Sequence, residues 1–95
     1  MQEAFLQFVW ELGLFNKQNL KDQHGQEVEI LDLGRLNRDT GPDFLHGKVR
    51  IDGTDWYGQI EIHVNGKDWY RHGHQMDEAF NSVILHVVWG GEDVI

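Results

Sequence analysis

The chain of 95 residues contains no cysteine. A disulfide framework, a thiolate metal site and a cysteine nucleophile are therefore excluded. No apolar run approaches the roughly 20 residues that cross a bilayer. No signal peptide opens the chain either, because Glu3 and Glu11 bracket the first apolar stretch. These absences predict a cytoplasmic protein without a membrane segment.

Positive charge is also scarce. Lys and Arg number 8 against 16 Asp and Glu, which gives a formal net charge of −8 with histidine neutral. This balance argues against a free-standing nucleic-acid binder, because such proteins use basic side chains to displace counterions from phosphates. It does not exclude an enzyme that acts on nucleic acid and gathers acidic side chains around divalent metals. With 40 % apolar and 12 % aromatic residues, a single domain can build a core.

Hydrophobic spacing predicts an α+β fold in the order αβββαβ, a small mixed sheet flanked by helices. The first helix covers residues 2–12 and is expected to bury a stripe formed by Phe5, Phe8, Val9 and Leu12. The expected strands are residues 27–33, 44–51, 56–64 and 83–89, with a polar loop over residues 34–42 and a second helix over residues 68–80.

The two central strands alternate between their faces. In the first of them, Leu45, Val49 and Ile51 share one face, and His46, Lys48 and Arg50 share the other. In the next strand, Ile60, Ile62 and Val64 face one way, and Gln59, Glu61 and His63 face the other. Lys48 and Arg50 either contact phosphate or only keep the strand soluble, and the sequence leaves both roles open.

Two acidic residues are predicted to converge at one end of this sheet. Asp43 follows a proline at the entrance to one central strand, and Glu61 lies in the next strand, two residues before His63. A hairpin lays these strands side by side, and residues i and i+2 of a strand share a face. Two carboxylates there suit a hard divalent cation such as Mg²⁺ or Mn²⁺. Such an ion lowers the pKa of a bound water and neutralises charge on phosphate.

The Pro-Asp pair ending at Asp43 and the run Glu61-x-His63, on this order of elements, resemble the PD-(D/E)xK nuclease superfamily. The resemblance implies a restriction-endonuclease-like core that hydrolyses phosphodiester bonds of nucleic acid, with Asp43 and Glu61 as metal ligands. An acidic residue of the first helix often joins that site, and Glu11 is the matching position.

One departure from the superfamily pattern opens a second possibility. His63 stands where the superfamily has lysine, and a histidine can ligate metal or act as general base near neutral pH. The alternative is a catalytically inactive binding or scaffold module of the same fold, in which the loss of lysine accompanies the loss of activity.

A second resemblance covers nearly the whole chain. It is carried by N-x-D-x-G-P-D-F (37–44), G-Q-I-E-I-H-V (58–64), D-W-Y-R-H-G-H (68–74) and N-S-V-I-L-H-V-V (81–88). These runs resemble an uncharacterised bacterial family, domain of unknown function 2851. Members of that family are longer, so the resemblance implies that residues 1–95 form a single domain, here nuclease-like, at the N-terminal end of a longer chain. The family implies no activity.

Six histidines are many for this length. His72 and His74, with His63 and either Asp68 or Asp77, could form a structural zinc site, or they could simply hydrogen-bond backbone and carboxylate groups. His86, inside an apolar strand, is either a core histidine or lines the same site as Glu61.

The loop and the sheet edge leave further alternatives open. Asn37 either caps the loop before Asp43 or supports the metal ligands from behind. An exposed sheet edge could also pair two copies into a homo-oligomer.

Overall fold

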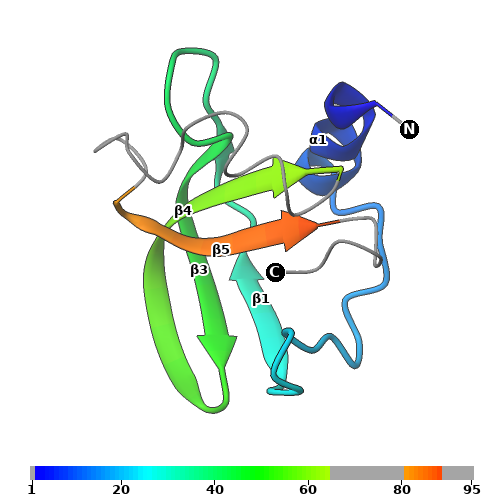
Figure 1. Ribbon diagram of the computed structural model, residues 1–95, viewed down its shortest axis with the longest axis vertical. Coiled ribbons are helices and arrows are strands. Elements are labelled where there is room, and N and C mark those ends of the chain that lie inside the picture. Colours follow the sequence, from blue (N-terminus) through cyan, green and yellow to red (C-terminus); the bar gives the residue numbers. More distant parts are fainter. Residues whose placement is uncertain (1, 65–80, 89–95) are drawn as a thin grey trace.

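A computed structural model describes residues 2–64 and 81–88. Over these residues, one helix, α1 (Glu3–Glu11), is followed by five strands: β1 (Val28–Asp32), β2 (Arg35–Leu36), β3 (Phe44–Ile51), β4 (Thr54–His63) and β5 (Val83–Val88). The described part is thus a small α+β domain with a five-stranded mixed sheet (Figure 1). The predicted second helix, residues 68–80, lies outside the described residues. No helix in the described ranges is long and apolar enough to span a membrane.

The sheet has the order β1-β3-β4-β5, and the short strand β2 pairs with the beginning of β3. β1, β3 and β4 are antiparallel neighbours, whereas β4 and β5 are parallel and point the same way in Figure 1. The four predicted strands are confirmed to within two residues at the ends that are described. The predicted polar loop over residues 34–42 is wrong in part, because β2 forms within it.

Helix α1 turns a different face to the core from the one predicted. Leu6 and Trp10, 6 % and 5 % exposed, are its buried residues. Three of the residues expected in the core are instead 51–54 % exposed: Phe5, Phe8 and Leu12. Trp10 explains the orientation, because its indole N–H donates to the Leu33 carbonyl at 3.0 Å and its ring stacks on Phe15. A Trp side chain has the largest apolar area to bury, and here its polar atom is also paired.

A β-bulge near the start of β3 decides which of its side chains face the core. Between two consecutive pairs with β4, β3 carries one residue more than β4. The bulge contains His46, whose φ of 62° is left-handed and whose N–H donates to Gln59 Oε1 at 2.8 Å. A one-residue shift moves side chains to the opposite face of a strand. Phe44 is therefore fully buried, at 0 % exposure, and Asp43 turns away from the core. The strict alternation had instead predicted Leu45 on the core side.

The core lies between α1 and one face of the sheet, and α1 contacts the end of β4 (Figure 1). Its buried members are Leu6, Trp10, Phe44, Ile60 and Ile62. The predicted alternation of β4 is present, but both of its faces are buried near its end. Glu61 and His63, opposite the core, are only 2 % and 1 % exposed. Polar side chains with this degree of burial require partners, and those partners define the candidate site.

Candidate functional site

The loop before β3 fixes the position of Asp43. The Asn37 N–H donates to the Asp43 carbonyl at 2.8 Å, and the Asn37 amide donates to the carbonyls of Thr40 and Pro42 at 3.1 and 2.9 Å. Gly41, with a φ of 108°, supplies a backbone conformation that other residues rarely adopt. Asn37 therefore organises the loop that brings Asp43 to the sheet. Of the two roles that the sequence left open for Asn37, this is the capping of the loop.

The Asp43 carboxylate ties three elements together. Its Oδ2 accepts a hydrogen bond from the Ile62 N–H of β4 at 2.8 Å. Its Oδ1 accepts one from the Gln7 side chain of α1 at 2.6 Å. Asp43 is thus held on both oxygens by protein donors, one of them backbone, and its orientation is fixed before any ligand arrives.

Glu61 lies next to this carboxylate. Its Oε1 is 3.3 Å from the Asp43 N–H, which donates to it. Burial, followed by a side-chain hydrogen bond to Asp43 and the charge of Asp43, raises the pKa of Glu61 from 4.5 to about 9. Two acids this close cannot both ionise easily, so at neutral pH Glu61 carries a proton that it shares with Asp43.

The helix contributes to this region through residues other than the predicted one. Glu11 is exposed at the end of α1, and its assignment to the site stays a prediction. Glu3, two turns earlier, is the helical acid whose charge acts on Glu61 and raises the pKa of that carboxyl. Gln7, one turn after Glu3, makes the direct contact with Asp43. The sequence offered a sign of this, because Glu3, Gln7 and Glu11 are spaced by one turn, but nothing in it marked which turn faces the sheet.

Two histidines continue the site on the same face of the sheet. His63 follows Glu61 by two residues, and its Nε2 lies 4.0 Å from Glu61 Oε2. Its Nδ1 lies 2.7 Å from Nε2 of His86, a hydrogen bond in which one ring donates and the other accepts. The two rings are nearly perpendicular, at 88°. His86 reaches this position because its residue pairs with Glu61 in the parallel register of β4 and β5. We call Asp43, Glu61, His63 and His86 the acid–histidine cluster.

The model of the family described as "Protein of unknown function (DUF2851)" matches residues 3–95. The chain belongs to this family. The prediction of that family from four sequence runs is therefore confirmed. Comparison with curated proteins and with solved structures gives no match. Since the DUF2851 family carries no assigned activity, the function of this domain has to be argued from its own geometry.

The cluster of this DUF2851 chain offers carboxylate oxygens and imidazole nitrogens within a small, buried space. Within residues 2–64 and 81–88, no group of three or more metal-ligating side chains is already arranged around one point. The donor set nevertheless suits a divalent cation, because a buried acid pair that holds a proton can exchange that proton for a metal ion. Four predicted residues cannot be placed, since Asp68, His72, His74 and Asp77 lie outside the described residues. The zinc site built on them stays a prediction.

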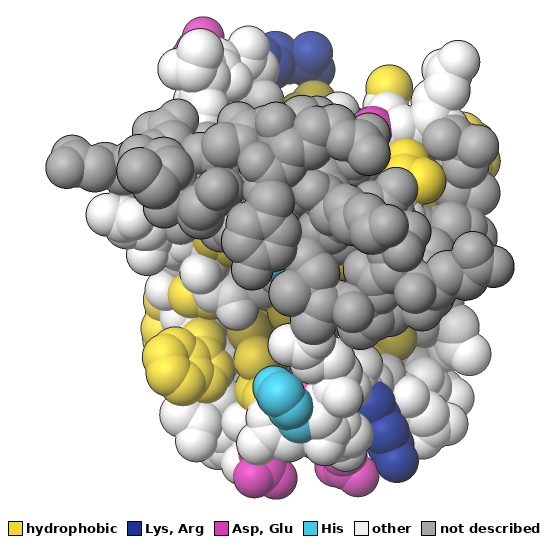
Figure 2. All heavy atoms as spheres, viewed as in Figure 1, with side chains coloured by type: hydrophobic (Ala, Val, Ile, Leu, Met, Phe, Trp, Pro, Cys, Tyr) yellow, Lys and Arg dark blue, Asp and Glu magenta, His cyan; other side chains and the backbone are white. Residues whose placement is uncertain are grey.

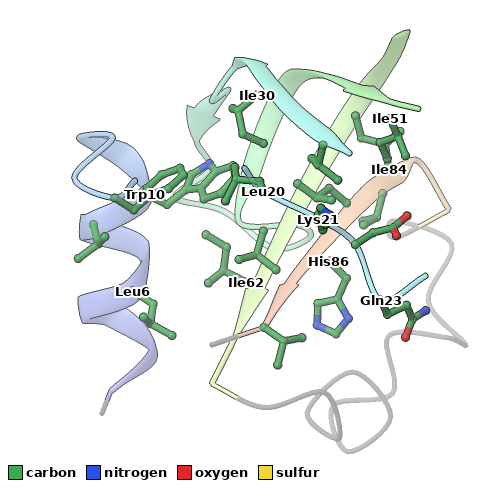
Figure 3. A pocket seen from close by; sticks show the side chains of 18 of the residues that line it. Leu6, Trp10, Leu20, Lys21, Gln23, Ile30, Ile51, Ile62, Ile84 and His86 are labelled. Carbon is green, nitrogen blue, oxygen red and sulfur yellow. The ribbon is translucent and has the colours of Figure 1, made fainter. Parts of the chain in front are cut away.

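A groove of about 910 Å³ lies apart from the two acids, on the side of the sheet that faces α1. Figure 3 shows Trp10 and Leu6 of the helix on one side of it and Ile62 on the sheet. Figure 2 shows hydrophobic side chains gathered in the region where the β3–β4 hairpin lies in Figure 1. Of the cluster residues described above, only His86 lines the groove. The groove is mainly apolar and neither acid lines it, so it is not the place where the acids act.

Proposed function

We propose that this DUF2851 domain is a divalent-metal-dependent phosphodiesterase of the PD-(D/E)xK nuclease type, acting on nucleic acid. The observation that carries the proposal is the meeting of Asp43, from the entrance of β3, with the buried carboxyl of Glu61 on β4. An α-helix followed by antiparallel strands and a parallel last strand supports a restriction-endonuclease-like core.

Asp43 and Glu61 would hold Mg²⁺ or Mn²⁺ through their oxygens, with His63 as an additional ligand or as the base. The fit rests on charge: burial and a neighbouring acid disfavour an ionised Glu61, and a divalent cation would offset both effects. A carboxylate has about four lone-pair positions, so the two bonds that Asp43 already accepts leave room for a metal. When bound, such an ion acidifies a coordinated water and neutralises charge on the phosphate.

The remaining residues would orient this pair. Gln7 and the Ile62 N–H hold the Asp43 carboxylate in place. His86 fixes the ring of His63, because a bond at Nδ1 leaves Nε2 as the nitrogen nearer to Glu61. Near neutral pH an imidazole in this position can accept a proton from an attacking water, a task that the lysine of the superfamily supports by its fixed charge.

A second candidate function is a scaffold module without catalysis. It is favoured by the two hydrogen bonds that Asp43 already accepts from protein donors, since these bonds join α1, β3 and β4 whether or not a metal binds. It is also favoured by histidine at residue 63 in place of lysine. On this view the acid–histidine cluster is a structural link between elements.

Titration calorimetry with Mn²⁺ and Mg²⁺ separates the two functions. The proteins compared are the unmodified chain, Asp43→Asn, Glu61→Gln and, as control, Asp39→Asn, which removes an exposed acid from the same loop. The nuclease proposal expects metal binding that is lost in the first two variants and kept in the control, together with metal-dependent cleavage of single- or double-stranded DNA or of RNA. Binding that is missing, or equal in all four proteins, supports the scaffold.

A further inference from the structure

The β3–β4 hairpin carries exposed aromatic and cationic side chains beyond the acid–histidine cluster. Lys48 and Tyr57 are directly opposite each other in the antiparallel register. Tyr57 is 70 % exposed, and Lys48 Nζ lies 4.8 Å from the centroid of its ring. An exposed ring beside a cation is an arrangement that can bind a base and a phosphate.

Tyr57 lies on the same face of β4 as the acid–histidine cluster. The two register shifts next to this strand are caused by extra residues in β3 and in β5, so the alternation of β4 itself is unbroken from Tyr57 through Glu61 to His63. Tyr57 precedes Glu61 by four residues, about 13 Å at ~3.3 Å per residue of a strand. This distance corresponds to about four nucleotides at the ~3.4 Å rise of a stacked strand. One nucleic-acid strand of this length can therefore span the distance between them.

The balanced charges of this hairpin suit a polyanion better than the net negative charge of the chain as a whole does. Arg50 is paired with Asp55 at 2.6 Å and with Glu29 of β1 at 3.6 Å, and Lys48 is 3.9 Å from the same aspartate. Residues 44–59 of the hairpin contain two cations, Lys48 and Arg50, and two anions, Asp52 and Asp55, and so carry no net charge, whereas the chain as a whole carries −8. Tyr57 and Asp55 raise the pKa of Lys48, so this side chain keeps its charge at neutral pH.

We infer that the outer face of this hairpin binds a single-stranded segment of nucleic acid beside the acid–histidine cluster, with a base stacked on Tyr57 and a phosphate contacted by Lys48. A single strand is required because bases inside a duplex do not present a free face for stacking. The inference deepens the proposed function and rests on it for the identity of the ligand. Of the two roles that the sequence left open for Lys48, it selects contact with phosphate.

Fluorescence anisotropy tests this surface without any cleavage. Labelled single strands of about 12 nucleotides, one of DNA and one of RNA, and a duplex of the same length are titrated with protein in a chelator that removes divalent metals. Tyr57→Ala is expected to weaken single-strand binding by about tenfold, within the ~1–3 kcal/mol that one stacked base contributes. Lys48→Ala is expected to reduce the slope of log affinity against log salt by about 0.7, the value for one phosphate of a single strand.

Two matched variants serve as controls. Trp56→Ala removes a 50 % exposed aromatic from the opposite face of the same strand. Lys17→Ala removes another lysine that lies over a ring, 5.8 Å from the centroid of Phe15. Both are expected to bind the oligonucleotides as the unmodified protein does. Equal losses in Trp56→Ala and Tyr57→Ala, no loss in Tyr57→Ala, duplex binding as tight as single-strand binding, or no binding at all would each overturn the inference.

The same proteins distinguish this inference from the proposed function. Asp43→Asn is expected to keep oligonucleotide binding and to lose metal binding. If Tyr57→Ala weakens oligonucleotide binding but no protein takes up metal or cleaves, the hairpin surface stands and the nuclease proposal fails. If metal-dependent cleavage occurs but Tyr57→Ala changes neither binding nor cleavage, the nuclease proposal stands and the inference about the hairpin surface fails.

Discussion

Glu61→Gln is expected to stabilise the metal-free protein at neutral pH, by an amount that grows as the pH rises. In the folded chain, burial and the neighbouring Asp43 raise the pKa of Glu61 to about 9 from its ordinary 4.5. In the unfolded chain the carboxyl returns to its ordinary pKa. Between these two values, the folded protein therefore holds one more proton than the unfolded chain.

This proton difference sets the sign and the size of the effect. The contribution of Glu61 to stability is fully present below its unfolded pKa and is lost as the pH rises toward its folded pKa. The free energy of unfolding falls by about 1.4 kcal/mol per pH unit in this window, or about 3 kcal/mol between pH 5 and pH 7. Glutamine is neutral at every pH and keeps the shape of protonated Glu61, so the variant does not lose this stability.

Urea unfolding, followed by tryptophan fluorescence without divalent metal, measures the difference. The free energies of unfolding of the unmodified protein and of Glu61→Gln are compared in steps from pH 5 to pH 8. Glu27→Gln, the same substitution at an exposed position, is the control and is expected to show no such slope. A difference between Glu61→Gln and the unmodified protein that stays constant over this range would refute the raised pKa and, with it, the shared proton of the acid pair.

Four further outcomes are expected. Trp10→Ala should lower the free energy of unfolding by about 3–5 kcal/mol, whereas Phe8→Ala should change it by less than about 0.5 kcal/mol; equal effects would contradict the helix orientation. Asp43→Asn should cost about 1–3 kcal/mol in urea unfolding, because Gln7 and the Ile62 N–H donate to different oxygens of Asp43 and the amide NH₂ of asparagine replaces one of these acceptors. His46→Gly should be neutral or stabilise by up to about 1 kcal/mol, because glycine adopts the φ of 62° without strain, and a clear loss would argue against the bulge. Mn²⁺ should bind more tightly as the pH rises from 6 to 8 and release a proton, as calorimetry in two buffers can measure; binding independent of pH would exclude the exchange of the Glu61 proton for metal.

The strands, and the end of the sheet to which both acids belong, were predictable because they depend on local patterns. The alternation of β4 and the short turn before it specify a hairpin. A hairpin brings the entrance of β3 close to the end of β4, but the bulge in β3 decides that Asp43 is opposite Glu61 and on its face of the sheet. The pairing of His86 with Glu61 needed only one further assumption, that β5 lies next to β4 in parallel.

The helix orientation and the bulge were not predictable from the same patterns. Phe5, Phe8 and Leu12 form as good an apolar stripe as Leu6 and Trp10, and only tertiary packing selects between them. The bulge depends on a histidine with a left-handed φ, which is rare for residues other than glycine and asparagine and carries no pattern of its own. Gln7 was missed for a related reason, since its role follows from which side of α1 meets the sheet.

The extra residue in β3 limits which insertions, deletions and substitutions the fold can accept in this strand. The two residues between Phe44 and Gly47 act as a spacer whose length, more than its composition, decides whether an acid or an aromatic ring enters the apolar interior. Shortening this spacer by one residue would exchange the places of Asp43 and Phe44 in a single step. Substitutions within it should be tolerated, whereas insertions and deletions should not.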